Sequence, residues 1–443
     1  MCLVLAQRSM SVFSPTNLPG QNIIQTRNTI NKPGALLDFM SQILPSDIPP
    51  QRPTSGIDEY PDIHTPEDLL AKVEEGIKIA PMPVRLSPHI LSTINWQDPL
   101  NDPVRRQFIP MKSTINVTHP AASLDPVAEV NSSPVEGLIH RYPTKALFMT
   151  TSVCPVYCRF CFRSYTVGTE TETVKKLRFL PLLKRWKPRL EYIANTPHLR
   201  DIVLSGGDTY LLEPEQVEWL GKELLKIPHI RILRFATKGV GVSPSRLVDP
   251  DDAWTKVIID LAQEARKMSK HVCVHTHINS TQEITWVTRR GAKRLYEEGV
   301  TVRNQSVLLN GVNNTVPAMM NLIHALSDMH IEPYYVYQSD MIPGAEDLRT
   351  PIRESHHIES EIRNQNAGFL MPRFVYDVPA SGKRPTLFAH YADEGLGLSK
   401  FRLPEAHGGS AEYWDPLWSL TEEKRVVIGE RFGVGVQGVR VGA

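Results

Sequence analysis

Three cysteines, Cys154, Cys158 and Cys161, lie close together in the segment TTSVCPVYCRFCFR. The segment follows an apolar run, 146–152, that predicts a β-strand, so one loop at the strand's end presents all three thiols. Three thiolates suit a [4Fe–4S] cluster that keeps one iron without a protein ligand. A zinc site normally takes a fourth Cys or His nearby, and the chain's other cysteines are distant in sequence. Structural zinc and inert thiols stay open as alternatives.

The Cys-x3-Cys-x2-Cys spacing resembles the signature of the radical SAM superfamily. In that superfamily the open iron binds the amino and carboxylate groups of S-adenosylmethionine (SAM), and one electron cleaves SAM to a 5′-deoxyadenosyl radical. The resemblance implies a [4Fe–4S] cluster, SAM and a one-electron reductant protein as the partners of this chain.

The next predicted strand, 201–207, ends in a turn that carries Gly206, Gly207 and Asp208. Paired glycines let the backbone approach a ligand closely, and a carboxylate accepts hydrogen bonds from an ammonium group. Taken alone, the pattern predicts only a turn. Its place one βα unit after the cysteines matches the element that radical SAM proteins use to bind the methionine amino group of SAM.

Apolar segments of β type alternate with helical patterns between about residues 145 and 340. The strand segments are 146–152, 201–207, 232–238, 272–278, 302–309 and 333–339. An apolar period of 3.6 residues predicts helices at 252–268 and 317–329. The alternation predicts an α/β fold and leaves both a doubly wound sheet and a barrel open. The radical SAM resemblance implies a partial (β/α)6 barrel with an N-terminal helical extension and a C-terminal extension.

Six ordered sequence blocks give a closer resemblance than the cysteine triplet. They are HRYPTKALFMTTSVCPVYCRFCFRSYTVG, DIVLSGGD, THIN, NQSVLLNGVNN, PYYVYQSD and FVYDVPASGKRP. They occur in the same order as in the lysine 2,3-aminomutases, and the resemblance covers roughly residues 85–390. Enzymes of that family combine the radical SAM cluster with pyridoxal 5′-phosphate (PLP). The family's PLP-binding lysine follows a glycine-rich turn, which implies Lys383 here.

The same resemblance implies the substrate contacts. Family members that act on lysine hold its ammonium group between two aspartates, and these match Asp340 of YQSD and Asp377 of YDVP. Glutamate aminomutases have other residues there, so the acidic pair favours a substrate with a cationic side chain. Arg163 matches the arginine that binds the substrate carboxylate, a task that suits a planar guanidinium group.

Further residues around the cofactors follow from the matching blocks. Arg141 and Tyr142 match residues around PLP. Lys145 stands where the bacterial enzymes have an arginine, so it keeps a positive charge for a phosphate but lacks the planar fork. His277 and Gln305 fall at matching strand ends, where they either line the SAM or PLP pocket or serve as satisfied structural polar groups.

One feature of the bacterial enzymes is missing from the sequence. Those enzymes bind zinc at a subunit boundary through a C-terminal group of cysteines, whereas this chain has no cysteine after Cys273. The resemblance therefore does not extend to the family's tetramer, and we leave a homo-oligomer open.

Composition and pattern divide the chain into four regions. They are 1–37, 38–139, 140–345 and 346–443. The first has no acidic residue and predicts either a disordered arm or a transit segment. The second is rich in proline, with helices predicted at 66–78 and about 88–96. The resemblance implies that the third is the radical SAM core and that the fourth closes over PLP and substrate. The fourth region ends in a glycine-rich tail, predicted to be irregular from Val426.

Segment 174–190 carries seven basic residues and no acidic one. Such a run either forms a solvated helix face or attracts an anionic partner, and we interpret it as a solvated helix face.

Composition excludes several classes of protein. The 443 residues are 41% hydrophobic and 22% charged, which supplies enough apolar material for a large core. The formal net charge is +1, so no global field would attract nucleic acid or an anionic membrane. No apolar run approaches the ~20 residues that span a bilayer. We expect a cytoplasmic protein, or a mitochondrial one if the N-terminal arm is a transit segment.

These observations lead to one primary hypothesis. The chain is a lysine 2,3-aminomutase, an isomerase of the intramolecular aminotransferase class that interconverts L-lysine and β-lysine. Alternatives are an aminomutase for ornithine or arginine, or one that supplies β-lysine for modification of a translation factor. A non-catalytic iron–sulfur scaffold needs neither Lys383 nor the aspartates, and a conventional PLP enzyme leaves the cysteines unexplained.

Overall fold

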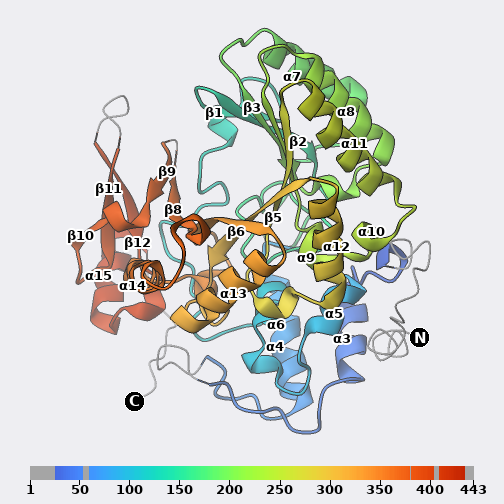
Figure 1. Cartoon of the computed structure of the whole chain (residues 1–443). Helices are drawn as coiled ribbons and strands as arrows, with labels where there is room; N and C mark the ends of the chain where they lie inside the picture. Colours follow the sequence, from blue (N-terminus) through green and yellow to red (C-terminus); the bar gives the residue numbers. More distant parts are fainter. Residues whose placement is uncertain (1–24, 53–58, 380, 404–408, 435–443) are drawn as a thin grey trace.

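One sheet of nine strands organises the fold (Figure 1). The computed structural model describes residues 25–52, 59–379, 381–403 and 409–434. Within these ranges, the strands of the sheet lie in the order in which they follow one another along the chain, and the six central ones are parallel. The central strands are β2 (Lys145–Thr151), β3 (Asp201–Gly206), β4 (Ile232–Ala236), β5 (His271–Thr276), β6 (Thr301–Leu308) and β7 (Ile331–Gln338).

This strand order decides between the doubly wound sheet and the barrel. A doubly wound sheet reverses its strand order at a switch point. Here every crossover adds the next strand on the same side, so successive right-handed βα units build a partial (β/α)6 barrel. The six predicted strands and the predicted fold class are confirmed.

Three further strands extend the sheet at its two edges. They are β1 (Leu138–Tyr142) next to β2, β8 (Arg373–Val378) next to β7, and β9 (Gly382–Pro385) next to β8. Among the described strands, no backbone ladder joins β1 to β9, and side chains bridge the edges instead. Arg141 donates a hydrogen bond to the carbonyl oxygen of Val378 over 2.9 Å. Gly382, at φ +79°, leaves room for the ring of Tyr142, which a Cβ atom there would approach to 2.5 Å.

Helices cover the outside of the barrel (Figure 1). They are α7 (Leu183–Ala194), α8 (Pro214–Lys226), α9 (Gly239–Val242), α10 (Ser245–Val248), α11 (Ala253–Lys267), α12 (Trp286–Glu297), α13 (Val316–Asp328) and α14 (Ile352–Arg363). Helices α11 and α13 confirm the two helices predicted from the apolar period. Asp252 and Thr315 explain where these two begin, because each side chain accepts a hydrogen bond from a backbone N–H of the first turn.

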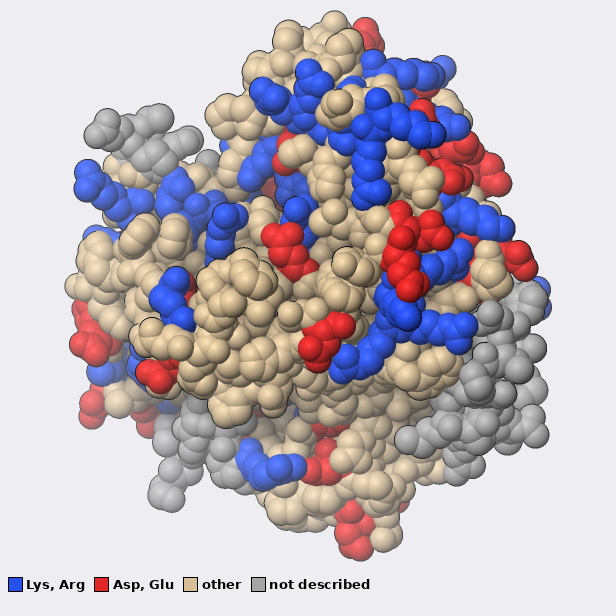
Figure 2. Space-filling view, viewed as in Figure 1, with Lys and Arg blue, Asp and Glu red and all other residues tan. Residues whose placement is uncertain are grey.

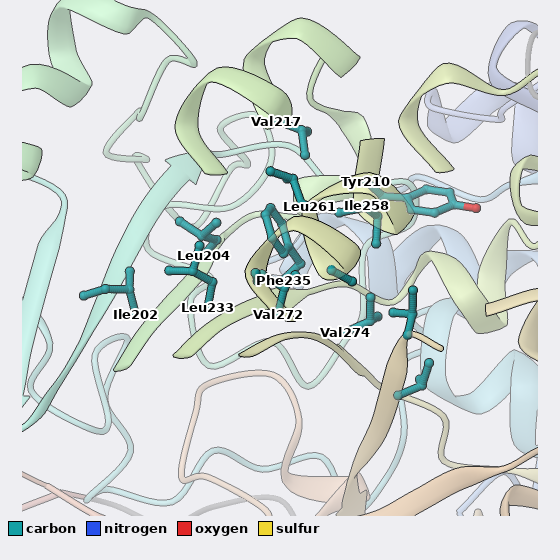
Figure 3. Close-up of a cluster of buried hydrophobic side chains, with 14 of the residues drawn as sticks. Ile202, Leu204, Tyr210, Val217, Leu233, Phe235, Ile258, Leu261, Val272 and Val274 are labelled. Atoms are coloured by element: carbon teal, nitrogen blue, oxygen red, sulfur yellow. The ribbon is translucent and has the colours of Figure 1, made fainter. Parts of the chain in front are cut away.

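Alternating side chains separate an apolar outer layer from a polar interior. Along β6, Val302 is buried among the core residues under the helices, whereas Gln305 on the opposite face is only partly buried. Figure 3 shows the outer layer, in which Phe235 of β4 and Leu261 of α11 meet. The polar groups therefore collect inside the barrel.

An N-terminal helical region packs beside one end of the barrel (Figure 1). Its helices are α3 (Pro33–Ser41), α4 (Pro66–Ile79), α5 (Pro88–Thr93) and α6 (Pro103–Phe108). Helix α4 confirms the prediction at 66–78. Helix α5 is shorter than the predicted 88–96, because the backbone of Ile94 is already extended. Ser87 joins the region to the barrel through a 2.6 Å hydrogen bond to the carbonyl oxygen of Val242.

The predicted N-terminal arm needs a correction at its C-terminal part. Gln25 is buried and accepts a hydrogen bond from the backbone N–H of His89 over 3.0 Å. Ile30 forms a β-bridge with Leu86. Apolar contacts and hydrogen bonds thus fix residues from 25 onward to the N-terminal region, and the rest of the predicted arm lies outside the described residues.

The C-terminal region adds a small antiparallel sheet to the core. It comprises β10 (His390–Asp393), β11 (Leu398–Arg402), β12 (Ser410–Trp414) and helix α15 (Glu422–Phe432). The predicted irregular tail is wrong over its first part, because residues 426–432 belong to α15; positions after 434 lie outside the described residues. Across the described ranges, no helix is both long and apolar enough to cross a bilayer.

The basic segment 174–190 is not one solvated helix face. Helix α7 begins only at Leu183, and two of the basic side chains are buried. The ammonium group of Lys176 donates to the carbonyl oxygens of Pro81 (2.6 Å) and Ser164. Arg189 donates to the carbonyl oxygens of Glu136 (2.7 Å) and Met149. Backbone carbonyls pair with these two charges inside the protein, which the run of charges alone does not reveal.

The turn after β3 binds tightly to the backbone that follows β2. The N–H of Gly207 donates to the carbonyl oxygen of Thr151 over 2.6 Å, and the N–H of Asp208 to that of Val153 over 2.9 Å. A Cβ atom at Gly207 would overlap the backbone of Val153. Glycine is therefore required here because two backbones meet.

We predict that Gly207→Ala lowers the free energy of unfolding by about 1–3 kcal/mol, because the added methyl group forces two backbones apart. Chemical denaturation of both proteins measures the difference. Gly34→Ala is the matched control, since nothing lies within 4 Å of a Cβ atom at that helical position, and it should keep or raise stability. Equal stability of the Gly207 variant and the parent protein would contradict the packing argument.

Candidate active site

The cysteine loop, residues 152–166, leaves the C-terminal end of β2 and presents Cys154, Cys158 and Cys161 as free, partly buried thiols. Burial raises the pKa of all three, that of Cys158 to about 12. The charges of the other two thiols raise the pKa of Cys154 further, so the three groups are near neighbours. Such thiols keep their protons until a metal cation replaces them.

The chemistry of these donors suits an iron–sulfur cluster, because three thiolates from one loop can each bind a different iron atom. Against the effect of burial, the positive charges of Arg85, Lys238 and Lys176 each lower the pKa of a neighbouring thiol. These cations would offset the negative charge of bound thiolates.

Hydrogen bonds from distant segments fix the cysteine loop. The N–H of Tyr157 donates to the carbonyl oxygen of Arg85 over 3.1 Å, and the N–H of Arg159 to that of Gln107 over 3.0 Å. The Arg159 guanidinium also donates to both carboxylate oxygens of Asp347, at 2.8 and 3.1 Å, and both side chains are buried. The shape of the loop therefore depends on the N-terminal region and on the segment after β7.

The structure places Gly206, Gly207 and Asp208 directly beside this loop. The Asp208 carboxylate accepts hydrogen bonds from the backbone N–H groups of Tyr210 (2.9 Å) and Lys238 (2.7 Å) and is only 3% exposed. It joins the turn after β3 to the end of β4. A direct contact of these residues with SAM stays a prediction.

A partly buried ion-pair cluster joins the two edges of the sheet. The Nζ atom of Lys383 on β9 lies 3.0 Å from Oδ2 of Asp377 on β8. Oδ1 of Asp377 also lies 3.2 Å from the guanidinium of Arg141 on β1. Burial opposes ionisation of Asp377, but the charges of Lys383 and Arg141 outweigh it and lower its pKa. The predicted PLP lysine and one predicted substrate aspartate are thus direct partners.

Aromatic rings line the pocket around Lys383. Its Nζ atom lies 5.6, 5.9 and 5.4 Å from the ring centroids of Tyr142, Tyr335 and Tyr337. Lys145 lies 3.7 Å from the Tyr142 centroid, and burial together with the charge of Lys383 lowers its pKa to about 8. The pocket therefore combines flat apolar surfaces with several cationic groups.

Three buried polar atoms near this pocket lack hydrogen-bond partners in the part of the chain that the structure describes. They are Nε of Arg141, the hydroxyl of Tyr142 and Nε2 of His275. Unsatisfied buried donors and acceptors are costly and normally bind water or a ligand. A planar, anionic cofactor such as PLP would supply an aromatic face for the tyrosines and oxygen acceptors for Arg141 and Lys145. The residues present therefore fit this group.

The two residues predicted at strand ends are neighbours, since a hydrogen bond joins His277 to the backbone of Gln305, but their side chains have different partners. Gln305 accepts a hydrogen bond from the hydroxyl of Tyr337 (3.0 Å), and its amide lies 2.6 Å from Nδ1 of His275. It thus belongs to the Lys383 pocket. His277 instead packs against Phe160 of the cysteine loop, with ring centroids 5.6 Å apart, so it lies on the cysteine side.

Asp340, which follows β7, is the least satisfied acid of the site. Burial and the negative charge of Asp377 raise its pKa to about 8. Within the described ranges its carboxyl group has no hydrogen-bond or ion-pair partner. At neutral pH Asp377 is therefore ionised and Asp340 is mostly protonated. A cation bound between them would favour the ionised form of Asp340 as well.

Arg163 meets a carboxylate from the protein itself. Its Nε and one terminal nitrogen donate to the two oxygens of Glu129 at 2.8 and 2.7 Å, and its other terminal nitrogen donates to the hydroxyl of Ser205 at 3.1 Å. The hydroxyl of Tyr165 also donates to Glu129. Asp125 positions this acid by accepting a hydrogen bond from the N–H of Glu129 over 2.9 Å.

Electrostatic neighbours connect the two sides of the site. The charge of Cys161 raises the pKa of Arg163, which burial alone would lower, and Glu129 raises it more strongly. Glu129 in turn raises the pKa of Asp340. With Asp377 and Lys383 next to Asp340, the structure brings the predicted cysteine, substrate and PLP residues into one interior.

The sequence reading missed several residues of this site, among them Glu129, His275, Tyr335 and Tyr337. The two tyrosines carried a usable signal, because residues two apart on a strand share a face. Glu129 carried none, since a single acid in a proline-rich, irregular segment has no informative spacing.

We predict that Asp340→Asn makes the protein more stable, and increasingly so as the pH rises. The pKa of Asp340 is about 8 in the folded protein and has its ordinary value of 3.8 in the unfolded chain. Between these values the folded state binds more protons, so rising pH destabilises it by at most about 1.4 kcal/mol per pH unit. Asparagine cannot ionise and removes this loss. Denaturation at pH 5, 6.5 and 8 without added cofactors measures the difference.

Asp377→Asn is the matched control. The pKa of Asp377 is lowered by Lys383 and Arg141, so its removal should cost stability at each of these pH values. Parallel pH profiles of the Asp340 variant and the parent protein would contradict the assignment of the raised pKa.

Comparisons with known proteins place the chain among aminomutases. No family model matches the sequence. The L-lysine 2,3-aminomutase of Clostridium subterminale is 35% identical over 326 residues, which are 73% of each protein. That of Bacillus subtilis is 33% identical over 82% of this chain and 76% of its own length. The glutamate 2,3-aminomutase of Clostridioides difficile is 28% identical over 73% of this chain and 72% of its own.

Among solved structures, SuiB of Streptococcus suis bound to S-adenosylmethionine aligns with 53% of this chain and 51% of its own at 14% identity and a TM-score of 0.37, a likeness too distant to support an argument. The relatives found by sequence similarity, and not the solved structure, identify the family of this chain. Their identity of about 35% over about three quarters of both proteins confirms the resemblance seen in the sequence blocks. The chain belongs to the L-lysine 2,3-aminomutase family of isomerases.

Proposed function

We propose that the protein interconverts L-lysine and β-lysine by 2,3-amino migration, using a [4Fe–4S] cluster, SAM and PLP. The observation that carries this proposal is the acidic pair Asp340 and Asp377 beside Lys383, in the same interior as Arg163 and the cysteines. The names of the relatives support aminomutase chemistry. Because a glutamate aminomutase is also a relative, the choice of substrate depends on the charges of the pocket.

Each cofactor has candidate ligands in the chain. Cys154, Cys158 and Cys161 would hold the cluster, and Gly206, Gly207 and Asp208 of the turn after β3 would contact SAM. Lys383 would hold PLP, with Arg141 and Lys145 near its phosphate. When bound, the cluster and SAM supply one-electron chemistry that removes a hydrogen atom from the substrate, and PLP supplies a conjugated ring that assists nitrogen migration.

The chain's own residues would bind the two ends of the substrate. Glu129 and Ser205 together accept three of the five N–H groups of the Arg163 guanidinium, so one N–H group on each terminal nitrogen remains for a substrate carboxylate. At the other end, an ammonium group would draw the proton off Asp340, whose pKa of about 8 lies close to neutrality. Asp377, whose Oδ2 lies 3.0 Å from Lys383 Nζ, would be the second acid close enough to face the substrate cation.

The acidic pair also orders the alternatives. Ornithine carries its ammonium group at a shorter distance from the carboxylate, and arginine differs from lysine in both the reach and the planar shape of its cation. Supply of β-lysine for modification of a translation factor would use the same chemistry. Glutamate would place a carboxylate beside Asp340 and Asp377, which like-charge repulsion opposes. A scaffold gains nothing from Asp340, since a buried, unpaired acid costs stability.

We predict that the reconstituted enzyme, kept anaerobic with SAM, PLP, dithionite and L-lysine, forms β-lysine, and that Lys383→Ala abolishes it. Mass spectrometry follows the product, with ornithine, arginine and glutamate in parallel reactions. Lys267→Ala, at an exposed helical lysine, is the control and should keep full activity. If another basic amino acid reacts and lysine does not, the aminomutase chemistry stands and the proposed substrate is wrong. Cleavage of SAM without any rearranged amino acid would overturn the aminomutase proposal.

We further predict that Glu129→Gln raises KM for the amino acid about tenfold, or about 1.4 kcal/mol, with a smaller effect on kcat. Glutamine cannot form the two charge-assisted bonds that orient the Arg163 fork. Steady-state kinetics measures both constants. Glu136→Gln is the control, because that exposed acid forms a long ion pair with Arg185, at 3.4 Å, on the protein surface. A lower KM would mean that Glu129 competes with the substrate carboxylate instead of orienting its partner.

A further inference from the structure

Residues 175–187 form a surface that the proposed chemistry does not use, and we call it the leucine–lysine patch. Four leucines are well exposed in it, at 40–55% of their surface: Leu177, Leu180, Leu182 and Leu183. Five exposed cations accompany them, namely Lys175, Arg178, Lys184, Arg185 and Lys187. A group of exposed leucines at this density indicates a contact surface and not an ordinary solvated face.

The patch lies directly outside the cysteine loop. The N–H of Leu177 donates to the carbonyl oxygen of Tyr165 over 2.9 Å, and the hydroxyl of Thr166 donates to the carbonyl oxygen of Leu177 over 2.8 Å. The N–H of Phe179 donates to the hydroxyl of Ser152 over 2.8 Å. The backbone of the patch thus pairs with both ends of the loop that carries the three cysteines.

A buried residue of the patch reaches still closer to the cysteines. The ammonium group of Lys176 donates to the carbonyl oxygens of Ser164, inside the cysteine loop, and of Pro81 (2.6 Å). A buried side chain of the patch therefore contacts the segment that carries the cysteines.

The charge of the patch is predominantly positive. Figure 2, viewed as in Figure 1, shows Lys and Arg side chains gathered over the upper part of the molecule, where Figure 1 places α7 and α8. Within the described chain, Arg185 pairs with Glu136 at 3.4 Å, whereas the other four exposed cations of the patch form no ion pair. The nearby acids Glu170 and Glu172 precede the patch in the chain and leave its net charge positive.

We propose that the leucine–lysine patch is the docking surface for an acidic one-electron carrier protein of the flavodoxin type. The proposal relies on the proposed function, because only a cluster that must be reduced needs such a partner. An apolar centre surrounded by cations fits a partner with exposed apolar residues inside an acidic rim. A second copy of this chain would bring like charges together, which disfavours self-association through this surface.

In the electron-transfer step, the carrier's flavin hydroquinone loses one electron and becomes the semiquinone. The oxidised cluster, [4Fe–4S]2+, gains that electron and becomes [4Fe–4S]1+. The chain contributes neither a proton nor a bond to this step, and the patch would serve only to bring the two cofactors close together.

The test compares binding and reduction in the cluster-loaded protein without substrate. Lys184→Glu/Lys187→Glu and, separately, Leu180→Ser are expected to weaken the affinity for an acidic flavodoxin, measured by calorimetry, about tenfold. The rate of cluster reduction by flavodoxin hydroquinone, followed anaerobically in a stopped-flow instrument, should fall in parallel. The rate with dithionite should not change, because a small reductant needs no docking surface.

Lys222→Glu/Lys226→Glu on neighbouring α8 is the matched control, since it changes the net charge equally and both lysines are already paired with acids. If it weakens binding as much as the patch variants, the effect is general charge and the docking proposal is wrong. Unchanged affinity of both patch variants would also overturn it. Because neither readout involves amino acid turnover, failure of the aminomutase proposal would be detected separately.

Discussion

The site depends on the shared carboxylate of Asp377. It lies between Lys383 on β9 and Arg141 on β1, and these strands belong to opposite edges of the sheet. Since no backbone ladder joins the edges in the described strands, this ion-pair cluster and the Arg141–Val378 hydrogen bond bridge them. A buried charge that loses its partner costs several kcal/mol, so the three groups hold one another in place. Both the geometry around Lys383 and the closure of the barrel therefore depend on this ion-pair cluster.

Parallel strands explain why the other functional residues meet. Each strand ends at the same rim of the barrel, and the loops that follow β2, β3 and β7 carry the cysteines, the glycine turn and Asp340. Tyr335, Tyr337 and Gln305 lie within β7 and β6, on positions that face the inside of the barrel. Separate sequence segments thus supply a polar interior, while helices supply the apolar support on the outside.

Much of this arrangement could be predicted from the sequence. Alternating apolar segments predicted all six central strands, because burial under helices imposes a strong pattern. Motif spacing predicted the cysteines, and the family blocks predicted Lys383, Asp340 and Asp377. Strand order could not be read from periodicity, and it alone distinguished the barrel from a doubly wound sheet. Burial of Lys176 and the pairing of Glu129 with Arg163 depend on contacts between distant segments, which local composition does not encode.

The anchoring of the cysteine loop has a consequence for the order of biogenesis. Arg159, within the loop, depends on Asp347, which lies 188 residues later in the chain. The loop therefore cannot acquire its final shape until the whole barrel, up to the segment after β7, has been synthesised. Contacts with such long sequence separation form late and slowly in folding. The arrangement of the three cysteines is accordingly a property of the nearly complete barrel and not of their local segment.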